Sequence, residues 1–312
     1  MRTTRQCMLT GMLVLIVALA MAAPASADSF FPGIVPETEW SGAVNGDVYI
    51  QYSDTWSTSN PIDHDEAWAT FDDIPCDITV KEARLYVVPY MGNQNQTYTG
   101  TLYANWTSNG VTTTLSCAEP LNLSFPPPAW RNGPTAESPD LLYLNRVTSD
   151  YVVVYDVTDL IDSTSATVYL KTTNVSGNFD GRFKEAKLVI AYNVSPEEST
   201  GTTHYWVNEG HDPITYYGSG VAGQTSFEVP VIGTISNAVL YTDDIASANG
   251  VYTWNGESVV PTTLASNSYA RLNQFTLDPG DIEQDGDNVL TYNRVGNYYK
   301  LALAILKLQE SP

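Results

Sequence analysis

Basic residues are scarce in this chain, which has 14 Lys and Arg against 35 Asp and Glu and a formal net charge of −21. A polyanion would be repelled over the whole surface of such a protein, which argues against nucleic acid and anionic lipid as partners. The acidic surplus fits plain solubility, a high-salt habitat or cation binding. Cysteine is rarer still: there are three, and no CxxC pair offers the start of a closed zinc site.

Several patterns of enzymes and helical proteins are also missing. No segment keeps a helical period beyond about two turns, and neither an H-E-x-x-H nor a G-x-S-x-G motif occurs. His204 and His211 are separated by an odd spacing, which on a strand sends the two imidazoles to opposite faces and keeps them from one metal. We therefore expect a protein that is not an enzyme. A glycoside hydrolase with paired carboxylates stays open, because such a pair has no fixed spacing in sequence.

The N-terminus has the three parts of a secretory signal. Two arginines precede an apolar run over residues 8–23, and the small residues Ala25-Ser26-Ala27 follow it. We expect cleavage before Asp28, which makes residues 1–27 a signal peptide and the protein secreted or displayed at the cell surface. Loss of Arg2 and Arg5 moves the net charge from −21 to −23. No later stretch is long and apolar enough to cross a bilayer, so we expect no direct membrane insertion of the mature chain.

Two cysteines, Cys76 and Cys117, remain after this cleavage. In an oxidising compartment an isolated pair favours a disulfide over a metal site. The bond would close a loop of about forty residues and contribute roughly 3–4 kcal/mol.

Short β-branched and aromatic runs, separated by Gly, Asn, Asp and Pro, dominate the remaining chain. Residues 47–52, 83–88 and 187–192 are examples. Such runs at regular intervals without helices between them predict an all-β protein of antiparallel, jelly-roll-like β-sandwiches.

The chain also repeats itself. Five short segments recur in the same order in both halves: residues 46–52, 71–75, 83–86, 155–160 and 187–190 match residues 203–208, 227–230, 238–241, 277–282 and 300–303. A tandem duplication explains this order and predicts two domains, 28–196 and 197–312, with a linker near 195–201. The spacing from Leu85 to Asp156 exceeds that from Leu240 to Asp278. The surplus places a Pro-rich insertion at about 116–149 in the first domain.

The end of each half resembles a known family. Residues 156–160 (DVTDL) and 278–282 (DPGDI), each followed by a polar turn and a strand, are similar to a passage of galactose-binding-like jelly rolls. Residues 205–210 (YWVNEG) resemble a hallmark of tandem extracellular domains of unknown function in secreted and cell-surface proteins of methanogenic archaea. The resemblance implies an archaeal envelope context, with an outer layer or sheath as a home, and assigns no active-site residue.

Two acidic stretches are candidate metal sites. Asp281, Glu283, Asp285 and Asp287 imitate the start of an EF-hand loop, but Tyr292 stands where that loop needs a glutamate, and a solvated turn explains the same residues. Residues 63–66 (DHDE) could likewise hold calcium or remain solvated. No cofactor is expected, with Ca²⁺ as the alternative.

Aromatic residues are plentiful, with 20 Tyr and 7 Trp. Because sugars stack on aromatic faces, Trp130 and Trp254, in Pro- and Gly-bounded contexts, are candidate glycan-stacking residues. The alternative is burial in the sheets, where aromatic side chains pack across strands.

Five N-glycosylation sequons all fall in the first half. They are Asn95, Asn105, Asn122, Asn174 and Asn193.

Our leading hypothesis is a non-catalytic extracellular or cell-envelope protein, structural or interacting, that assembles with other envelope proteins or with itself. One alternative is a carbohydrate-binding module that attaches to polysaccharide. It predicts exposed, coplanar aromatic residues on one face, whereas buried Trp side chains favour the structural role. A second alternative, a calcium-dependent adhesin, predicts that a chelator lowers the melting temperature.

Overall fold

Antiparallel strands make up nearly all of the described chain, as the all-β prediction requires. The computed structural model describes residues 34–53, 66–90, 92, 98–115, 121–125, 131–132, 140–147, 150–213, 222–245, 250–266, 269–295 and 299–311, with only the backbone described at 121–125, 131–132 and 143–147. Two single-turn 3-10 helices, η2 (Thr158–Leu160) and η3 (Pro279–Asp281), are the helical elements in these ranges. None of the described helices could span a membrane. The predicted signal peptide lies outside the described residues.

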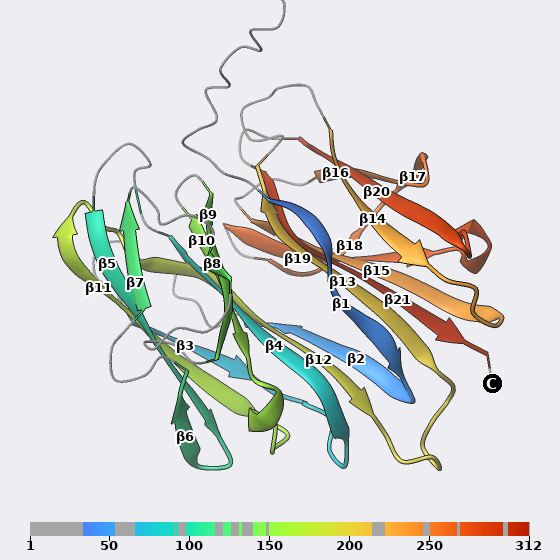
Figure 1. Ribbon diagram of the computed structural model, residues 1–312, viewed down its shortest axis with the longest axis horizontal. Helices are drawn as coiled ribbons and strands as arrows, with labels where there is room; N and C mark the ends of the chain where they lie inside the picture. Colours follow the sequence, from blue (N-terminus) through green and yellow to red (C-terminus); the bar gives the residue numbers. More distant parts are fainter. Residues whose placement is uncertain are drawn as a thin grey trace, which may run out of the picture. The chain divides into compact units, whose positions relative to one another are not determined.

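Two sheets come mainly from the first half of the chain (Figure 1). Sheet B has the order β2 (Gly46–Tyr52), β12 (Arg182–Asn193), β4 (Thr79–Tyr90), β10 (Asp150–Asp156), β9 (Leu141–Val147) and β8 (Arg131–Asn132). Sheet C has the order β3 (Glu66–Phe71), β11 (Ala166–Gly177), β5 (Tyr98–Ser108) and β6 (Val111–Thr114), and β7 (Leu121–Phe125) also pairs with β5.

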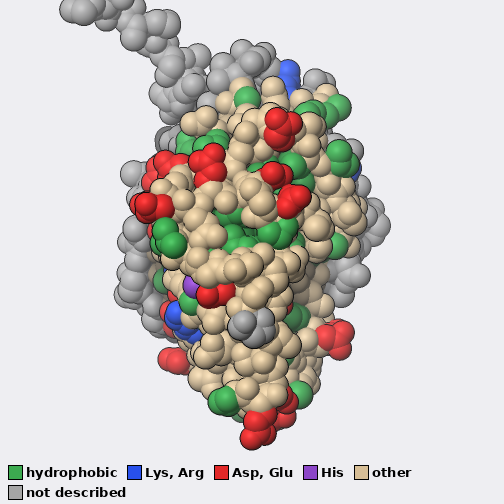
Figure 2. Space-filling view, turned by 90° about the vertical axis from the view of Figure 1, so that its right-hand side faces the viewer, with side chains coloured by type: hydrophobic (Ala, Val, Ile, Leu, Met, Phe, Trp, Pro, Cys, Tyr) green, Lys and Arg blue, Asp and Glu red, His purple; other side chains and the backbone are tan. Residues whose placement is uncertain are grey.

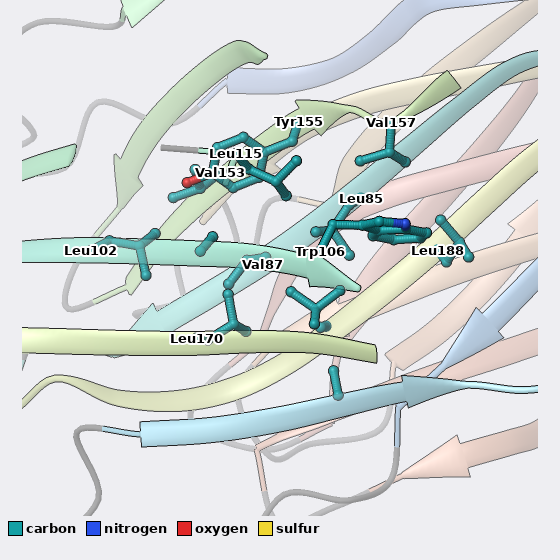
Figure 3. Packing of buried hydrophobic residues seen from close by; sticks show 14 of the residues in the cluster. Leu85, Val87, Leu102, Trp106, Leu115, Val153, Tyr155, Val157, Leu170 and Leu188 are labelled. Carbon is teal, nitrogen blue, oxygen red and sulfur yellow. The ribbon is translucent and has the colours of Figure 1, made fainter. Parts of the chain in front are cut away.

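Sheets B and C enclose the first hydrophobic core (Figure 3). Along β5 buried and half-buried residues alternate strictly, because successive side chains of a strand point to opposite faces. Trp106 from β5 is 1% exposed, stacks on Phe71 from β3 with ring centroids 6.4 Å apart, and lies in the same core as Leu85 and Leu188 of sheet B. The alternating pattern of sheet C therefore buries one face and leaves the other to solvent.

Two more sheets come mainly from the second half. Sheet A has the order β1 (Ile34–Val44), β13 (Thr203–Asp212), β21 (Lys300–Glu310), β15 (Ile235–Ile245), β19 (Ala270–Leu277) and β18 (Thr262–Ser266). Sheet D has the order β14 (Gly223–Val229), β20 (Gly286–Arg294), β16 (Gly250–Trp254) and β17 (Glu257–Val259). Sheets A and D enclose a second core, in which Trp254 packs on Phe227 with ring centroids 5.8 Å apart.

The two halves share one strand order. Sheet B has the order β2, β12, β4, β10, β9, and sheet A has the matching order β13, β21, β15, β19, β18. Sheet C has the order β3, β11, β5, β6, and sheet D has the matching order β14, β20, β16, β17. Leu85 and Leu240 lie on matching strands, each facing the strand that ends in the acid-led turn, but two residues apart in register: Leu85 pairs with Tyr155, next to Asp156, and Leu240 pairs with Phe275, three residues before Asp278. In those turns Asp156 Oδ1 accepts from the Thr158 amide and Asp278 Oδ1 from the Gly280 amide, both at 2.9 Å.

A second segment of the predicted repeat is further out of register. Leu188 pairs with Leu85, and Leu306 pairs with Leu240. Leu301 pairs with Asp244 instead, so the sequence match of residues 187–190 with 300–303 does not hold in the structure. Both segments are long apolar runs, which fit a buried strand in several registers.

A third core joins the two sandwiches. Side chains on the outward faces of sheets B and A, such as Val152, Val189, Tyr205 and Ile305, form one buried cluster. The strand β1, which the sequence analysis assigned to the first domain, pairs with β13 across the predicted boundary at 196/197. By its contacts, residues 33–312 form one compact unit, with the four sheets in the layer order C, B, A, D.

Candidate functional site

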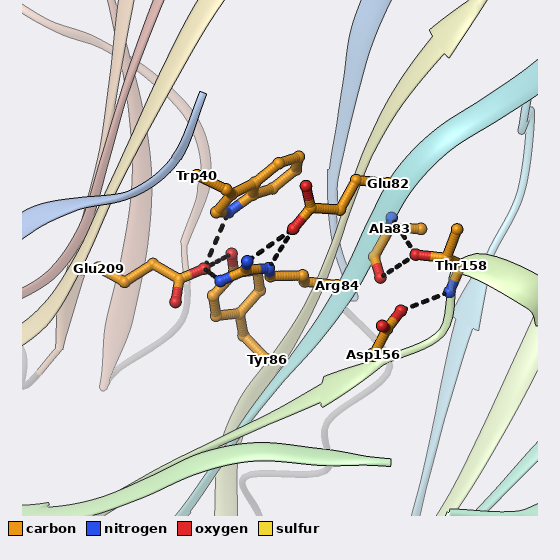
Figure 4. A network of polar contacts seen from close by, with 8 residues as sticks. All are labelled: Trp40, Glu82, Ala83, Arg84, Tyr86, Asp156, Thr158 and Glu209. Atoms are coloured by element: carbon orange, nitrogen blue, oxygen red, sulfur yellow. Dashed lines mark hydrogen bonds and ion pairs between the residues drawn. The ribbon is translucent and has the colours of Figure 1, made fainter. Parts of the chain in front are cut away.

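Glu209 of β13 is the centre of a buried polar network between the two sandwiches (Figure 4). Its Oε1 accepts from Trp40 Nε1 and from Arg84 Nη1, both at 2.9 Å, and from the hydroxyl of Tyr86. The Arg84 guanidinium also pairs with Glu82 at 2.6 Å and lies over the Trp40 ring, 5.0 Å from its centroid. The network thus ties β1 and β13 of sheet A to β4 of sheet B.

The segment that resembles a family hallmark builds this junction. Within residues 205–210, Tyr205 is fully buried against Trp40 in an edge-to-face contact at 5.5 Å. The Asn208 amide donates to Thr225 Oγ1 and to the Ser226 carbonyl, each at 2.7 Å. A Cβ on Gly210 would come within 2.6 Å of the Ile34 carbonyl oxygen, so only glycine lets β1 approach. These residues hold β1, β13 and β14 together.

A second cluster places one lysine between two carboxylates. Lys187 of β12 is 2.6 Å from Glu185 and also pairs with Asp243 of β15; all three are about 1% exposed or less. Burial and the neighbouring Asp243 raise the pKa of Glu185 well above its usual range. One ammonium balances one carboxylate, so the raised pKa lets the second carboxyl keep its proton.

A third cluster places one carboxylate between two lysines. Asp150 of β10 lies between Lys184, at 2.8 Å, and Lys300 of β21. Burial alone would raise the pKa of Asp150, but the two ammonium groups outweigh it and hold this pKa well below its usual range. Asp150 is therefore a carboxylate at neutral pH, and its pair with Lys300 joins sheet B to sheet A.

Asp244 lies in the second core beside β16. Its carboxyl accepts from Asn273 Nδ2 at 2.7 Å, from the Tyr299 hydroxyl at 3.0 Å and from the Tyr252 hydroxyl. Burial raises the pKa of Asp244 to about 7 against these three donors, and Asp243 raises it further. Raised carboxyl pKa values are typical of catalytic acids, but substrate must also reach the group. Asp244 is only 2% exposed, so its present role is internal.

An exposed tryptophan, Trp68, lies on the face of sheet C that points away from the first core. Among the exposed large apolar side chains of the described residues, Trp68 of β3 is the one aromatic, at 53% exposure. Its ring lies 5.2 Å from that of Tyr169 on the neighbouring strand β11, at an interplanar angle of 46°. The sequence analysis missed Trp68, although its spacing of three from the buried Phe71 puts the two on opposite faces of one strand.

The prediction that Trp254 stacks on a glycan is wrong. It is 2% exposed in the second core, and no sugar can reach its ring. The glycine that prompted the prediction belongs to the turn after β16, where Asn255 and Gly256 both have positive φ, while Trp254 itself closes the strand facing inward. Trp130 lies outside the described residues.

The predicted calcium loop is organised by amide side chains. Asn288 accepts from the Glu283 amide and donates to the Glu283 carbonyl, both at 2.8 Å, while Asn255 Nδ2 donates to the Asp281 carbonyl at 2.9 Å. Asp285, at φ 60°, and Asp287 line a hollow with Glu228. Among the described residues no three His, Cys, Asp or Glu side chains come together as metal ligands. Calcium at Asp281, Glu283, Asp285 and Asp287 stays a prediction without support from this geometry.

In the other acidic stretch, Glu66 is described and pairs with Lys171 at 2.7 Å, whereas residues 63–65 lie outside the described ranges. Cys76 is exposed and has no disulfide partner among the described residues. Cys117 is outside them, so the bond between the two stays a prediction.

The sequons differ in their surroundings. Asn174 is exposed on β11, and its amide donates to the Gly177 carbonyl at 3.2 Å. Asn193 is half-buried and accepts from the Asn45 amide at 2.8 Å. Asn105 is half-buried in the middle of β5, opposite Tyr169. The side chains of Asn95 and Asn122 are outside the described part, and use of any sequon stays a prediction.

The fold and its polar junction define an all-β protein of two stacked sandwiches. The chain belongs to a family described as "Protein of unknown function (DUF3344)", whose model matches residues 32–309. No curated protein matches it. The archaeal context and the galactose-binding-like character expected from the sequence stay predictions.

Several solved structures are distantly similar. PNGase F, a glycosylasparaginase from Flavobacterium meningosepticum, is 10% identical over 85% of this chain and 97% of its own, with a TM-score of 0.27. A β-porphyranase of glycoside hydrolase family 86 from Bacteroides plebeius is 11% identical over 78% of this chain and 39% of its own, with a TM-score of 0.23. A Streptomyces avermitilis α-L-rhamnosidase is 12% identical over 91% and 28%, with a TM-score of 0.22. Similarities this low do not indicate a shared activity.

Proposed function

We propose that this protein is a non-catalytic, extracellular scaffold of the cell surface or envelope. The observation that carries the proposal is the junction of the two sandwiches. Sheets A and B bury a common apolar core, and four ion pairs between described residues cross from one sheet to the other: Arg84–Glu209, Lys187–Asp243, Lys300–Asp150 and, nearer the surface, Lys307–Asp47. Burying the charges of the first three pairs contributes little net stability but favours one relative arrangement of the sandwiches.

The use of the ionisable groups supports a scaffold over an enzyme. Glu185, Asp150, Glu209 and Asp244 are each 2% exposed or less, and each is paired with or hydrogen-bonded to neighbours in the interior. An enzyme needs such groups within hydrogen-bond reach of a substrate. Here they hold one part of the protein to another.

The surface charge supports a protein that stays dispersed in solution until it meets a specific partner. Asp and Glu side chains predominate over Lys and Arg on the side of the unit where β14, β17 and β20 lie (Figure 2). An acidic surface keeps copies soluble until a specific contact forms, since like charges repel at long range. The contacts proposed are with other envelope proteins or with further copies of this chain.

Fractionation of native cells tests the proposal. We expect mass spectrometry to recover the chain, starting at Asp28, in the envelope fraction, and chemical cross-linking of intact cells to join it to a second envelope protein or a second copy. Recovery as a free monomer in the medium or in the cytoplasm would contradict the scaffold role.

A further inference from the structure

The outer face of sheet C is built in three regular rows. Cross-strand pairing aligns the side chains that point away from the first core. The rows are Glu66–Lys171–Tyr103, then Trp68–Tyr169–Asn105–Thr114, then Thr70–Thr167–Thr107–Thr112. With strands about 4.8 Å apart and rows about 6.7 Å apart, the face measures roughly 14 by 13 Å.

The middle row presents aromatic rings to solvent in a fixed arrangement. Tyr169 packs on the ring of Trp68, and its hydroxyl donates a hydrogen bond to Glu66, whose pKa is lowered by the hydrogen bond from Lys171 and then by that from Tyr169. Tyr103, in the adjacent row, has its hydroxyl 3.4 Å from Thr114 Oγ1. The rings are therefore positioned before any ligand arrives, which lowers the entropic cost of binding.

Polar groups surround these rings. The third row is a line of four threonine hydroxyls, and within it Thr107 and Thr112 are 2.9 Å apart. Each hydroxyl can donate one hydrogen bond and accept others. The only charges in the three rows, Lys171 and Glu66, neutralise each other at 2.7 Å.

The second half of the chain supplies an internal comparison. Pairing places Gln224, Thr291 and Thr253 of sheet D where sheet C has Trp68, Tyr169 and Asn105. On the buried faces the halves agree, since Phe71 and Trp106 match Phe227 and Trp254. On the outer faces only sheet C carries the aromatic residues, so the shared architecture does not require them there.

We propose that the outer face of sheet C binds a neutral saccharide. The apolar C–H face of a pyranose packs on aromatic rings, and its hydroxyls exchange hydrogen bonds with a surrounding polar rim. The chain's charge of −21 disfavours acidic polysaccharides, and the paired Lys171 provides no free cation for them. This site goes beyond the scaffold role and shares with it only the extracellular setting.

The test is binding of the mature protein, made in a host that does not glycosylate so that Asn105 is bare, to an array of neutral and acidic oligosaccharides. We expect binding to at least one neutral glycan. Trp68→Ala and Tyr169→Ala should each weaken it about tenfold or more, Trp68→Phe should retain most of it, and Gln224→Ala and Thr291→Ala, at the matching places of sheet D, should leave it unchanged.

Trp68 is exposed, so we expect its alanine variant to keep the wild-type melting temperature, which separates lost binding from lost folding. Failure to bind any neutral glycan would overturn the proposal. So would equal binding by Trp68→Ala, or dependence of a protein–protein contact on Trp68 in the absence of glycan. None of these results depends on where the protein is found in the cell, so the scaffold proposal is judged separately.

Discussion

Asp244 is a buried carboxyl whose protonation changes in the neutral pH range. Its folded pKa of about 7 lies above its ordinary value of 3.8. The folded state therefore binds a proton that the unfolded state has released, and the stability from Asp244 is fully present below about pH 4 and lost as the pH rises towards 7. We expect the unfolding free energy to fall over this window, by roughly 4 kcal/mol at most.

Urea unfolding of the wild type and of Asp244→Asn at pH 5 and pH 8 measures this contribution. The variant should lose part of the fall between the two pH values, and Glu185, whose pKa is also raised, contributes to the remainder. Asp150→Asn provides the opposite sign, since the lowered pKa of Asp150 makes its contribution present at neutral pH and lost in acid. An Asp244→Asn profile parallel to that of the wild type would contradict the assignment.

For single residues, the sequence predicts which face of a strand a side chain occupies better than whether that face is exposed to solvent. Alternation within residues 66–71 separates Trp68 from Phe71, and the same rule at residues 250–254 places Trp254 with Tyr252 in the core. The adjacent turn glycine misdirected the prediction for Trp254. The partners that Glu209, Lys187 and Asp150 have in the other sandwich, Arg84, Asp243 and Lys300, could not be predicted, because no local pattern encodes an ion pair between sheets.

Among the elements, β13 carries the junction through Glu209. Removing this carboxylate leaves the Arg84 guanidinium buried without its cross-sandwich partner, and also frees the Trp40 indole and the Tyr86 hydroxyl. Breaking a buried pair in this way costs about 3–5 kcal/mol. We expect Glu209→Ala to lower the unfolding free energy in urea by this amount.

Glu39→Ala is the matched control, because Glu39 is exposed on the neighbouring strand β1 and should change stability by no more than about 0.5 kcal/mol. A double-mutant cycle with Arg84→Ala isolates the coupling. Equal effects of Glu209→Ala and Glu39→Ala would show that the network adds nothing to the junction.

The order of the strands was largely predictable from the sequence, but the pairing of β1 with β13 of the other half was not. Recurrence of short motifs indicated two like modules, and matching strand orders in sheets B with C and A with D agree with it. The repeated motifs give no sign that β1 leaves its own half for β13, since strand pairing between distant segments is decided by packing. Repeated motifs indicate which strands exist, but not which of them pair. Gly210, whose backbone lies close to Ile34, is a local sign in the sequence of the β1–β13 pairing.

For the whole unit, the layer order makes each sandwich depend on the other. The core shared by sheets A and B would face water if the sandwiches came apart, as would the ion pairs that cross it. Exposing apolar area costs roughly 25 cal/mol per Å², so a half that unfolds alone would destabilise its neighbour. The two halves should therefore unfold together, although each has its own core.

Scanning calorimetry tests this coupling. We expect one transition for the mature protein, with a calorimetric enthalpy equal to the van't Hoff enthalpy. Glu209→Ala combined with Lys187→Ala removes two of the four cross-sandwich ion pairs described above. This double variant should show two transitions, or a ratio of calorimetric to van't Hoff enthalpy that departs from one. Trp254→Ala, which damages the second core by about 3–5 kcal/mol but leaves the junction intact, should lower the melting temperature while keeping a single transition. Two separate transitions in the wild type would mean that the sandwiches fold independently, and the rigid scaffold would lose its physical basis.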